Sequence, residues 1–463
     1  MDSSKNKSKN VLVLGGGISG VGAARLLRKH GHKVLISDLS PFPSEQTALF
    51  RELQIDFSEG QQTLDLLKNV EEMVTSPGIP PNVPIIREAV SRGIPVISEI
   101  DLALSEFTGK LISVTGTNGK STTCVMTSHI LCQSGFPAVA GGNIGKSPSE
   151  LIAVSEMKEY LVLELSSYQL ETSRPIHSDV AIFTSFSFDH LGRHKTMENY
   201  FKVKWKLIET VKPNGLIILT KEVFESSIDY GLSLPDNIPV ILIETTNLSS
   251  RFQTEPHQFF RISANNNLID KEGNILLSFE KSGISEYHNK INAAFSIFSA
   301  SHVTGKKPGD FIPMFQSFKP LPYRYQTIAH LREYPVINDS KSTNVESTMT
   351  ALSSLNNRCI LLLGGRAKDE SFEPILKFRE KIDLILCFGE SSEKISSDLN
   401  NAIPIKMFKS LASCVVELPD IFSKSPSTIL FSPGCASFDE FKNFEHRGEF
   451  FSSQMVKYSR ELY

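Results

Sequence analysis

Short apolar runs alternate with glycine-bearing loops and helical stretches along the chain, and this alternation limits the possible fold more than any other feature. The runs form three groups, which are Val11–Leu14, Val34–Ser37, Met73–Thr75 and Val96–Ile97, then Leu111–Val114, Tyr160–Leu165, Val180–Thr184 and Leu216–Leu219, and finally Cys359–Leu363, Leu384–Phe388 and Thr428–Phe431. Helical patterns such as Gly20–His30, Lys120–Gln133 and Asn344–Ser354 lie between them. Buried strands that alternate with helices form parallel sheets covered on both faces. We therefore predict an α/β fold.

The chain length sets the expected number of domains. At about 150 residues per domain, 463 residues predict three domains. The first group of strands ends near Ser98, and two prolines interrupt the chain at Lys319-Pro320-Leu321-Pro322. We predict domains at 1–98, 99–319 and 320–463. The segment 221–287 has only isolated apolar residues, and we expect it to add a small antiparallel piece to the central, mostly parallel sheet.

Composition excludes several classes of protein. Apolar residues make up 40% of the chain and the net charge is −3, so the chain is neither disordered nor a basic, sequence-independent nucleic-acid binder. No apolar stretch approaches the roughly 18 residues of a membrane span. The six cysteines form no CxxC pair, and glycines interrupt the apolar run VLVLGGGISG that could imitate a signal peptide. We expect a cytoplasmic, reduced monomer.

A phosphate-binding loop follows the first strand of the second group. The segment Thr115–Thr122 reads TGTNGKST and lies between that strand and a long helical pattern. Its end matches a P-loop, in which backbone N–H groups surround phosphates, Lys120 neutralises the β and γ oxygens, and Ser121 binds Mg²⁺. Val114 occupies the first glycine position of a strict Walker motif. A chance match is a weak alternative because the loop stands between a strand and a helix.

Two further polar residues follow strands of the same group. Glu164 lies near the end of the run Tyr160–Leu165, and an acidic residue at such a strand end usually serves the metal of a nucleotide site. His190 follows the run Val180–Thr184. A solvent-exposed glutamate and a hydrogen-bonded histidine without a ligand remain the simpler interpretations of these two residues.

A glycine turn follows the first strand of the chain. Gly15, Gly17 and Gly20 match GxGxxG, and Asp38 ends the next strand, where a carboxylate can accept from a ribose hydroxyl. This pattern by itself suggests a nicotinamide-dependent dehydrogenase, or a turn that only packs a helix on a sheet. A dehydrogenase would leave the P-loop and Glu164 without a role. NADH binding without ATP binding would identify the dehydrogenase.

The motifs together resemble the Mur ligase family, ATP-dependent ligases that form the amide bonds of the peptidoglycan stem peptide. The resemblance rests on TGTNGKST, GGNIG at 141–145, ELSSYQLE at 164–171 and DHL at 189–191, and it spans nearly the whole chain. NDSKSTN at 338–344, LGGRAK at 363–368 and SPGCASFDEFKNF at 432–444 resemble the branch that adds D-glutamate to UDP-N-acetylmuramoyl-L-alanine. A relative that adds another amino acid is the alternative within the family, and a nucleotide-gated binding module without turnover is the alternative outside it.

The resemblance implies a role for each domain. The first and third domains would be Rossmann-like and the central one a P-loop ATPase-type domain. The residues that match contacts to the UDP-sugar substrate are Ile18, Ser19, Asp38, Ser76, Pro77, Gly78, Asn143, Ser166 and Gln169. Those that match the ATP site are Gly116, Thr117, Asn118, Gly119, Lys120, Ser121, Thr122, Asn289, Asn292, Arg324, Asp339 and Lys341. Those that match the D-glutamate site are Thr343, Lys368, Ser437 and Phe444.

The resemblance also implies two Mg²⁺ ions and a modified lysine. Ser121 and Glu164 match ligands of the first ion, and His190 matches a ligand of the second. Lys204 aligns with a lysine that CO₂ carbamylates, and this change turns a cation into an oxygen-bearing anion that suits Mg²⁺. Lys202 and Lys206 are the alternative positions. Lys120, Glu164, His190 and Lys204 are thus the expected catalytic set, acting on small-molecule substrates through an acyl phosphate.

The chain departs from the family pattern at four positions. Gly192 stands where the family usually has Asp, so any support that this Asp provides near the second metal must come from elsewhere. Tyr323 replaces a usual His before Arg324, Gln326 replaces a frequent Glu, and Glu346 replaces a small residue. None of these changes removes a residue to which we assign chemistry.

Overall fold

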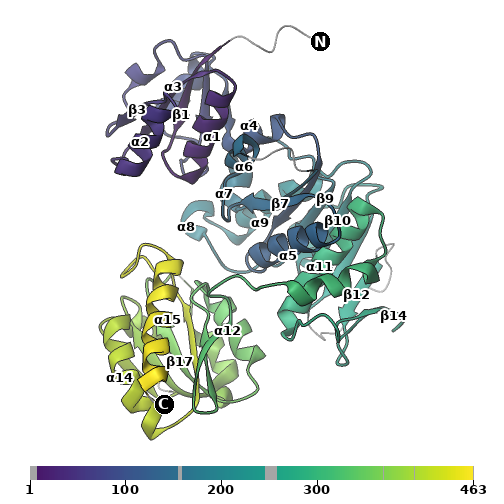
Figure 1. Ribbon diagram of the computed structural model, residues 1–463, viewed down its shortest axis with the longest axis vertical. Coiled ribbons are helices and arrows are strands. Elements are labelled where there is room, and N and C mark those ends of the chain that lie inside the picture. The colour runs from purple at the N-terminus through teal and green to yellow at the C-terminus, as the bar shows by residue number, and fades with distance from the viewer. Residues whose placement is uncertain (1–7, 155–158, 246–257, 369, 401, 462–463) are drawn as a thin grey trace. The chain divides into compact units, whose positions relative to one another are not determined.

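A computed structural model describes residues 8–154, 159–245, 258–368, 370–400 and 402–461 (Figure 1). It contains three sheets of five, nine and six strands. The chain divides into two compact units. The first holds the five- and nine-stranded sheets, and the second holds the six-stranded sheet together with the short segments 187–189 and 286–288. The predicted α/β class is confirmed, whereas the three domain boundaries stay a prediction.

The first sheet is entirely parallel, in the order β3-β2-β1-β4-β5. Its strands are β1 (Asn10–Leu14), β2 (Lys33–Asp38), β3 (Asp56–Glu59), β4 (Glu72–Thr75) and β5 (Val96–Ser98). The helices of this part are α1 (Ile18–Lys29), α2 (Ser44–Glu52), η2 (Leu64–Leu67), α3 (Pro84–Ser91) and α4 (Glu99–Ser105). Helix α4 begins with a capping box, in which Ser98 accepts from the Asp101 amide and Asp101 accepts from the Ser98 amide.

The second sheet has nine strands in the order β14-β13-β12-β11-β10-β9-β6-β8-β7. They are β6 (Lys110–Thr115), β7 (Ala138–Gly142), β8 (Tyr160–Glu164), β9 (Val180–Phe183), β10 (Leu216–Thr220), β11 (Val240–Glu244), β12 (Gln258–Ile262), β13 (Asn267–Asp270) and β14 (Ile275–Ser278). The helices are α5 (Lys120–Gln133), α6 (Pro148–Val154), α7 (Ser167–Thr172), α8 (Leu191–His194), α9 (Met197–Glu209), α10 (Lys221–Asp229), α11 (Tyr287–Thr304) and η3 (Pro308–Ser317). Strands β13 and β14 pair antiparallel, which agrees with the antiparallel addition predicted within 221–287. Residues 246–257 of that segment lie outside the described residues.

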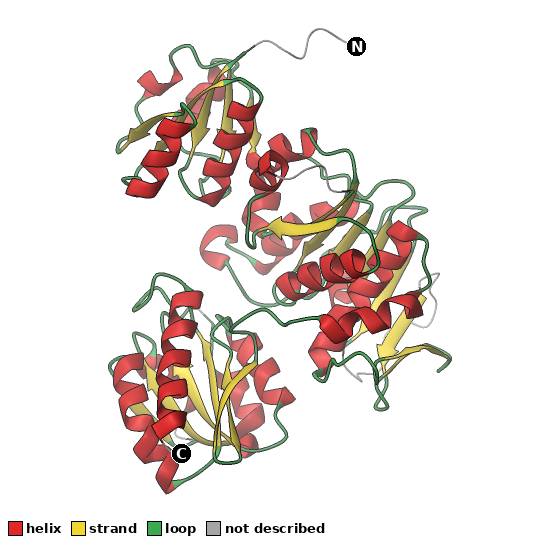
Figure 2. Ribbon diagram, in the orientation of Figure 1, coloured by secondary structure: helices red, strands yellow, loops and turns green. Residues whose placement is uncertain are grey.

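The third sheet has the order β15-β16-β20-β17-β18-β19, with only β15 antiparallel to its neighbour. Its strands are β15 (Gln326–Leu331), β16 (Tyr334–Asn338), β17 (Cys359–Gly364), β18 (Ile382–Phe388), β19 (Ile405–Phe408) and β20 (Thr428–Gly434). Its helices are α12 (Val345–Ser354), η4 (Glu373–Lys381), α13 (Ser392–Leu399), α14 (Leu411–Lys424) and α15 (Phe444–Glu461). Helices cover both faces of this sheet (Figure 2). No helix in the described part of the chain is long and apolar enough to span a bilayer.

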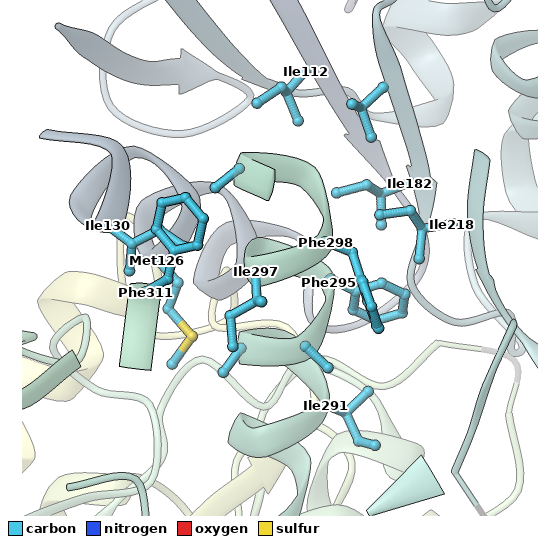
Figure 3. Close-up of a cluster of buried hydrophobic side chains, with 14 of the residues drawn as sticks. Ile112, Met126, Ile130, Ile182, Ile218, Ile291, Phe295, Ile297, Phe298 and Phe311 are labelled. Atoms are coloured by element: carbon cyan, nitrogen blue, oxygen red, sulfur yellow. The ribbon is translucent and has the colours of Figure 1, made fainter. Parts of the chain in front are cut away.

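The core of the nine-stranded sheet fixes the position of the phosphate-binding helix. Helix α11 lies against both the sheet and α5, with Phe295 and Phe298 directed toward Ile218 of β10 and Ile297 directed toward Met126 of α5 (Figure 3). Burial of each such side chain contributes about 1.5–3 kcal/mol. The start of α5 is therefore held by a large apolar cluster.

Candidate functional site

The loop Gly116–Gly119 joins β6 to α5, so the P-loop lies at the carboxyl end of a central strand, as its sequence predicted. Gly116 has φ +144°, and a Cβ at this position would lie 2.1 Å from Thr184 Oγ1. Only glycine fits this conformation and this close approach. Gly119 caps α5 in the left-handed region, with φ 82°. The N-terminus of α5 thus presents backbone N–H groups and the positive end of a helix dipole.

The segment after β9 braces the phosphate loop. Ser185 O accepts from the Thr117 amide at 2.8 Å, and Ser185 Oγ accepts from the Asn118 amide at 2.8 Å. Thr184 Oγ1 donates to Asn118 O. The Lys120 ammonium donates to Thr117 O at 2.7 Å. These contacts hold the loop in one conformation, which lowers the entropic cost of ordering it around a phosphate.

Glu164 lies beside the phosphate loop. It is the last residue of β8, is only 2% exposed, and pairs in register with Val114 of the neighbouring strand β6. Its Oε1 accepts from Asn143 Nδ2 at 2.8 Å, and its main-chain oxygen accepts from the Asn143 amide at 2.9 Å. Burial raises the pKa of Cys124 on α5, and the charges of Glu164 and Lys120 also act on this thiol. Lys120 begins α5, and Glu164 ends the strand next to the one that leads into α5.

The oxygens of Ser121 and Glu164 fit a Mg²⁺ ion bound with nucleotide phosphates. Ser121 is in the first turn of α5 and is 4% exposed. Among the described residues, no three His, Cys, Asp or Glu side chains come together as a cation site. Mg²⁺ at phosphoryl-transfer sites uses one or two carboxylates together with phosphate oxygens and water. A hydroxyl and one carboxylate beside a P-loop match that donor set.

The structure distinguishes the three candidate lysines of α9. Lys204 is 1% exposed, and its Nζ donates to Gly116 O at 2.8 Å and to Thr115 Oγ1 at 3.3 Å. Lys202 is exposed and pairs with Glu198, and Lys206 is exposed as well. Lys204 therefore contacts the phosphate loop, whereas its two rivals lie on the solvent face of the helix.

His190 lies in a cluster of aromatic side chains. It precedes α8 and has φ 54°, and its Nδ1 lies 3.2 Å from the hydroxyl of Tyr168. His194 is buried and stacks on Tyr200, with ring centroids 5.4 Å apart. The Tyr200 hydroxyl lies 3.4 Å from Thr117 Oγ1, and Lys204 Nζ lies 4.9 Å from the Tyr200 ring centroid. Tyr200 thus connects the phosphate loop to the histidines.

Gly192 leaves space in this region. No atom lies within 4 Å of a Cβ built at this glycine, so an aspartate would fit without a clash. The departure from the family pattern at this position is therefore not forced by packing.

The glycine turn of the first sheet lies where the strand order reverses. The ends of β2, β1 and β4 are adjacent, and they bring together Asp38, the turn Gly15–Gly20 and Ser76–Gly78. Asp38 Oδ2 accepts from the Gly16 amide at 2.6 Å, so this carboxylate holds the turn itself. A Cβ at Gly20 would lie 1.8 Å from Gly15 O. Ligands of open α/β sheets bind at such switch points. Ile18, 69% exposed, and Ser19 begin α1 at this edge.

Several predicted ligand contacts also support the backbone. Ser166 and Gln169 form the capping box of α7, with Gln169 Oε1 accepting from the Ser166 amide at 2.9 Å. Asn292 Oδ1 accepts from Thr123 Oγ1 on α5 at 3.2 Å, and Asn292 Nδ2 donates to Asn289 Oδ1 at 3.4 Å. These side chains lie beside the phosphate loop and help to hold the elements around it.

The third sheet brings its predicted residues to one edge. Strands β16, β20 and β17 are neighbours and parallel, so the loops after them lie side by side. These loops and the start of α15 hold Asp339, Lys341, Thr343, Lys368, Ser437 and Phe444. Lys341 Nζ lies 4.1 Å from the Phe444 ring centroid. Arg324 precedes β15 in the same unit.

Asp339 is a buried carboxyl group at this edge. It accepts from Ser342 Oγ at 2.5 Å, Ser432 Oγ at 2.8 Å and the Tyr325 amide at 3.0 Å. Burial raises the pKa of the Asp339 carboxyl to about 6, although these donors and the Arg324 charge favour its ionised form. Asp339 therefore joins the loop after β16 to strand β20 and to the segment before β15.

The sequence did not predict the residues that brace the site. Thr184, Ser185, Tyr168, Tyr200 and His194 received no role, although ELSSYQLE contains Tyr168 and the helical pattern around Lys204 contains Tyr200. Polar residues at the end of a predicted central strand and directly after it were the signal for Thr184 and Ser185. The aromatic contacts have no comparable signal, because they join segments that are distant in sequence.

Comparison with known proteins agrees with the geometry. A model of the Mur ligase middle domain matches residues 114–299, and a model of the Mur ligase MurD-like N-terminal domain matches residues 9–98. The chain is 35% identical to UDP-N-acetylmuramoylalanine–D-glutamate ligase of Leptospira interrogans over 96% of both chains. It is 32% identical to the enzyme of the same name from Cytophaga hutchinsonii, over 97% of this chain and 99% of that one.

A solved structure shares the fold. UDP-N-acetylmuramate-alanine ligase from Thermotoga maritima aligns with a TM-score of 0.60 and 18% identity, over 97% of this chain and 100% of that chain. The solved structure shows that the fold is shared, and no more, because its sequence identity is low. The sequence identity above 30% over nearly the full length shows common ancestry. The chain belongs to the Mur ligase family.

Proposed function

We propose that this protein is an ATP-dependent ligase that adds D-glutamate to UDP-N-acetylmuramoyl-L-alanine in the synthesis of peptidoglycan precursors. The observation that supports this function best is the braced phosphate loop, with Lys120 at the start of α5 and Glu164 at the end of the adjacent strand. Relatives that align over nearly the full length have this activity in their names. A dehydrogenase would not use this loop.

The reaction would proceed through an acyl phosphate. A carboxylate oxygen of UDP-N-acetylmuramoyl-L-alanine attacks the γ-phosphorus of ATP, and ADP leaves. The D-glutamate amine, after losing a proton, attacks the acyl carbonyl carbon, and inorganic phosphate leaves as the amide forms. Lys120 and the N–H groups of the loop would stabilise charge on the transferred phosphoryl group. Ser121, Glu164 and His190 would hold Mg²⁺, which supplies further positive charge at the phosphate oxygens.

The substrates would occupy the carboxyl edges of the sheets. The UDP portion would bind at the glycine turn with Asp38 and Ser76–Gly78, and the muramoyl-alanine portion near Asn143, Ser166 and Gln169. ATP would also contact Asn289, Asn292, Arg324, Asp339 and Lys341. D-glutamate has two carboxylates, which need donors when buried, and Thr343, Lys368, Ser437 and Phe444 would form its pocket. We also propose that the protein acts as a monomer.

Phosphate release tests this function directly. With ATP, Mg²⁺ and UDP-N-acetylmuramoyl-L-alanine, we expect release only when D-glutamate is added, at a rate about 100-fold or more above those with L-glutamate, L-alanine or L-lysine. Omission of the UDP-sugar should abolish release. A preference for another amino acid would reject the D-glutamate assignment, and ATP binding without turnover on any amino acid would indicate a binding module.

We further propose that CO₂ carbamylates Lys204. The Nζ of this lysine lies within hydrogen-bond distance of the phosphate loop, where a cation would repel Mg²⁺ and a carbamate would attract it. Its two rivals are exposed. A carbamate at this position would offer the second metal two oxygens that share one negative charge.

Replacement of Lys204 tests the modification. We expect Lys204→Ala to lower kcat about 100-fold, because the carbamate that would hold the second Mg²⁺ is lost, and with it positive charge at the transferred phosphoryl group. Formate or acetate should restore part of the activity by supplying a carboxylate at the same place. Lys202→Ala and Lys206→Ala are matched controls on the same helix and should keep full activity without rescue. Steady-state ADP release measures all three variants. Full activity of Lys204→Ala without added carboxylate would reject the carbamate, and circular dichroism would show whether each variant is folded.

A further inference from the structure

We infer that Tyr168 is a positioning residue for His190, and that its hydroxyl selects the ring nitrogen with which His190 binds the second Mg²⁺. The Tyr168 hydroxyl lies 3.2 Å from His190 Nδ1, and the two ring centroids are 5.0 Å apart. This inference rests on the proposed function, since His190 is a metal ligand only if the site binds Mg²⁺ with ATP.

The two residues come from opposite sides of the phosphate-loop strand. Tyr168 is in α7, which follows β8, and His190 follows β9. Strands β8 and β9 are the two neighbours of β6, whose end begins the P-loop. The hydrogen bond therefore joins the loops on both sides of the strand that leads into the phosphate site. A contact at this place can control the position of His190 without itself touching a phosphate.

The backbone of His190 needs such support. Its φ of 54° lies in the left-handed region, which residues with a Cβ adopt at a cost of about 1–3 kcal/mol. Its main-chain oxygen accepts from the Arg193 and His194 amides, both at 3.1 Å, which fixes the peptide but not the imidazole ring. The Tyr168 hydroxyl supplies a contact to the ring itself.

Tyr168 is itself held in place. The capping box of Ser166 and Gln169 fixes the first turn of α7, which contains Tyr168. The Arg193 guanidinium carbon lies 5.3 Å from the Tyr168 ring centroid, and Arg193 pairs with Glu171 at 2.8 Å. The position of the hydroxyl is therefore set by groups on both α7 and α8.

The chemistry follows from the two nitrogens of imidazole. A neutral histidine that binds a metal through Nε2 carries its proton on Nδ1. That Nδ1–H can donate to the tyrosine oxygen, and this partner fixes the orientation of the ring, so that Nε2 is the nitrogen available to the metal. Phenylalanine in place of Tyr168 keeps the aromatic packing and removes only this oxygen. The ring of His190 would then lose the contact that orients its Nε2 toward the metal.

The test compares Tyr168→Phe with Tyr458→Phe. The Tyr458 hydroxyl donates a hydrogen bond to Pro419 O in the second unit. Its replacement by phenylalanine also deletes one hydroxyl and therefore serves as the matched control. Electron paramagnetic resonance measures Mn²⁺ binding in the presence of ATP and no other substrate. We expect Tyr168→Phe to weaken Mn²⁺ binding about 10-fold, as for other partners of metal-binding histidines, with Tyr458→Phe unchanged. Equal Mn²⁺ affinity in both variants would overturn the inference.

A second readout needs neither metal nor turnover. Histidine labelled with ¹⁵N reports the tautomer of His190, with the signals assigned from a His190→Gln variant. We expect the ratio of the two tautomers of His190 to differ between Tyr168→Phe and the wild type, because the hydroxyl contacts Nδ1 only in the wild type. An unchanged ratio would overturn the inference. Absence of D-glutamate-dependent turnover in the wild type would instead reject the proposed function. The thermal midpoint of each variant shows whether it is folded.

Discussion

Replacement of Lys120 by methionine is expected to lower kcat for ADP formation about 1000-fold. The lysine is the first residue of α5, and its ammonium lies over the loop, 2.7 Å from Thr117 O. Methionine has a similar length and no charge, so the transferred phosphoryl group loses a cation in a site where neighbouring groups are fixed. The KM for ATP should also rise, because the same cation contacts the bound nucleotide.

The loop itself should survive this substitution. Its amides donate to Ser185, and Thr184 donates to Asn118 O, so these contacts remain when the bond from Lys120 to Thr117 O is lost. Lys202→Met is the matched control, since Lys202 is exposed on α9. Steady-state ADP release and equilibrium dialysis with ATP separate turnover from binding. If Lys120→Met kept more than about a tenth of the wild-type kcat, the P-loop assignment would be wrong.

We expect Glu99→Gln to increase the free energy of unfolding by about 3 kcal/mol more at pH 8 than at pH 4.5. Glu99 is fully buried in the first turn of α4. Burial raises the pKa of its carboxyl from 4.5 to about 7, although donors from Ser149 and Ser19 favour the charged form. The Ser149 amide donates to Oε1 at 2.7 Å, and the glutamine oxygen can accept from the same amide.

The direction of this pH dependence follows from proton binding. Below pH 4.5 the carboxyl is protonated in both the folded and the unfolded state, so it does not change stability with pH. Between pH 4.5 and 7 the unfolded chain releases this proton while the folded chain keeps it, so the free energy of unfolding falls as pH rises. Above pH 7 both states are ionised and the cost stays constant. Glutamine does not titrate, so the Glu99→Gln variant does not lose this part of the free energy of unfolding as the pH rises.

Urea denaturation at several pH values measures the effect. The chain has one tryptophan, Trp205, which is buried in the same apolar cluster as Ile100 of α4. Its fluorescence therefore reports unfolding of the part that contains Glu99. Glu52→Gln, at an exposed position of α2, is the matched control. A stability difference between Glu99→Gln and wild type that stays constant from pH 5 to 8 would contradict the prediction.

The α/β class and most strands could be predicted because buried strands and amphipathic helices leave local patterns. The runs at Val11–Leu14, Leu111–Val114 and Cys359–Leu363 are all central strands in the structure, extended by one or two residues. Strands β3, β7, β11, β15, β16 and β19 were not predicted. β7 contains two glycines, and β15 lies at the edge of its sheet with mostly exposed or half-buried residues, so neither leaves a strong apolar pattern.

The candidate site was predictable where one motif is continuous in sequence. The positions of the P-loop glycines, Lys120 and Ser121 follow from local geometry alone, because a strand, a glycine turn and a helix follow one another in the sequence. Glu164 and His190 follow from a second rule, that the ends of neighbouring parallel strands share one edge. The individual ligand assignments stay predictions until they are measured.

By itself, the sequence determined the alternation of strands and helices, the phosphate loop and the set of polar residues at strand ends. Only the tertiary structure decided which lysine of α9 contacts the loop, and that Tyr168 contacts His190. The reason is physical. Strand and helix periodicity depends on neighbours within a few residues, whereas Lys204 and Gly116 are 88 positions apart and meet only when α9 packs on the sheet.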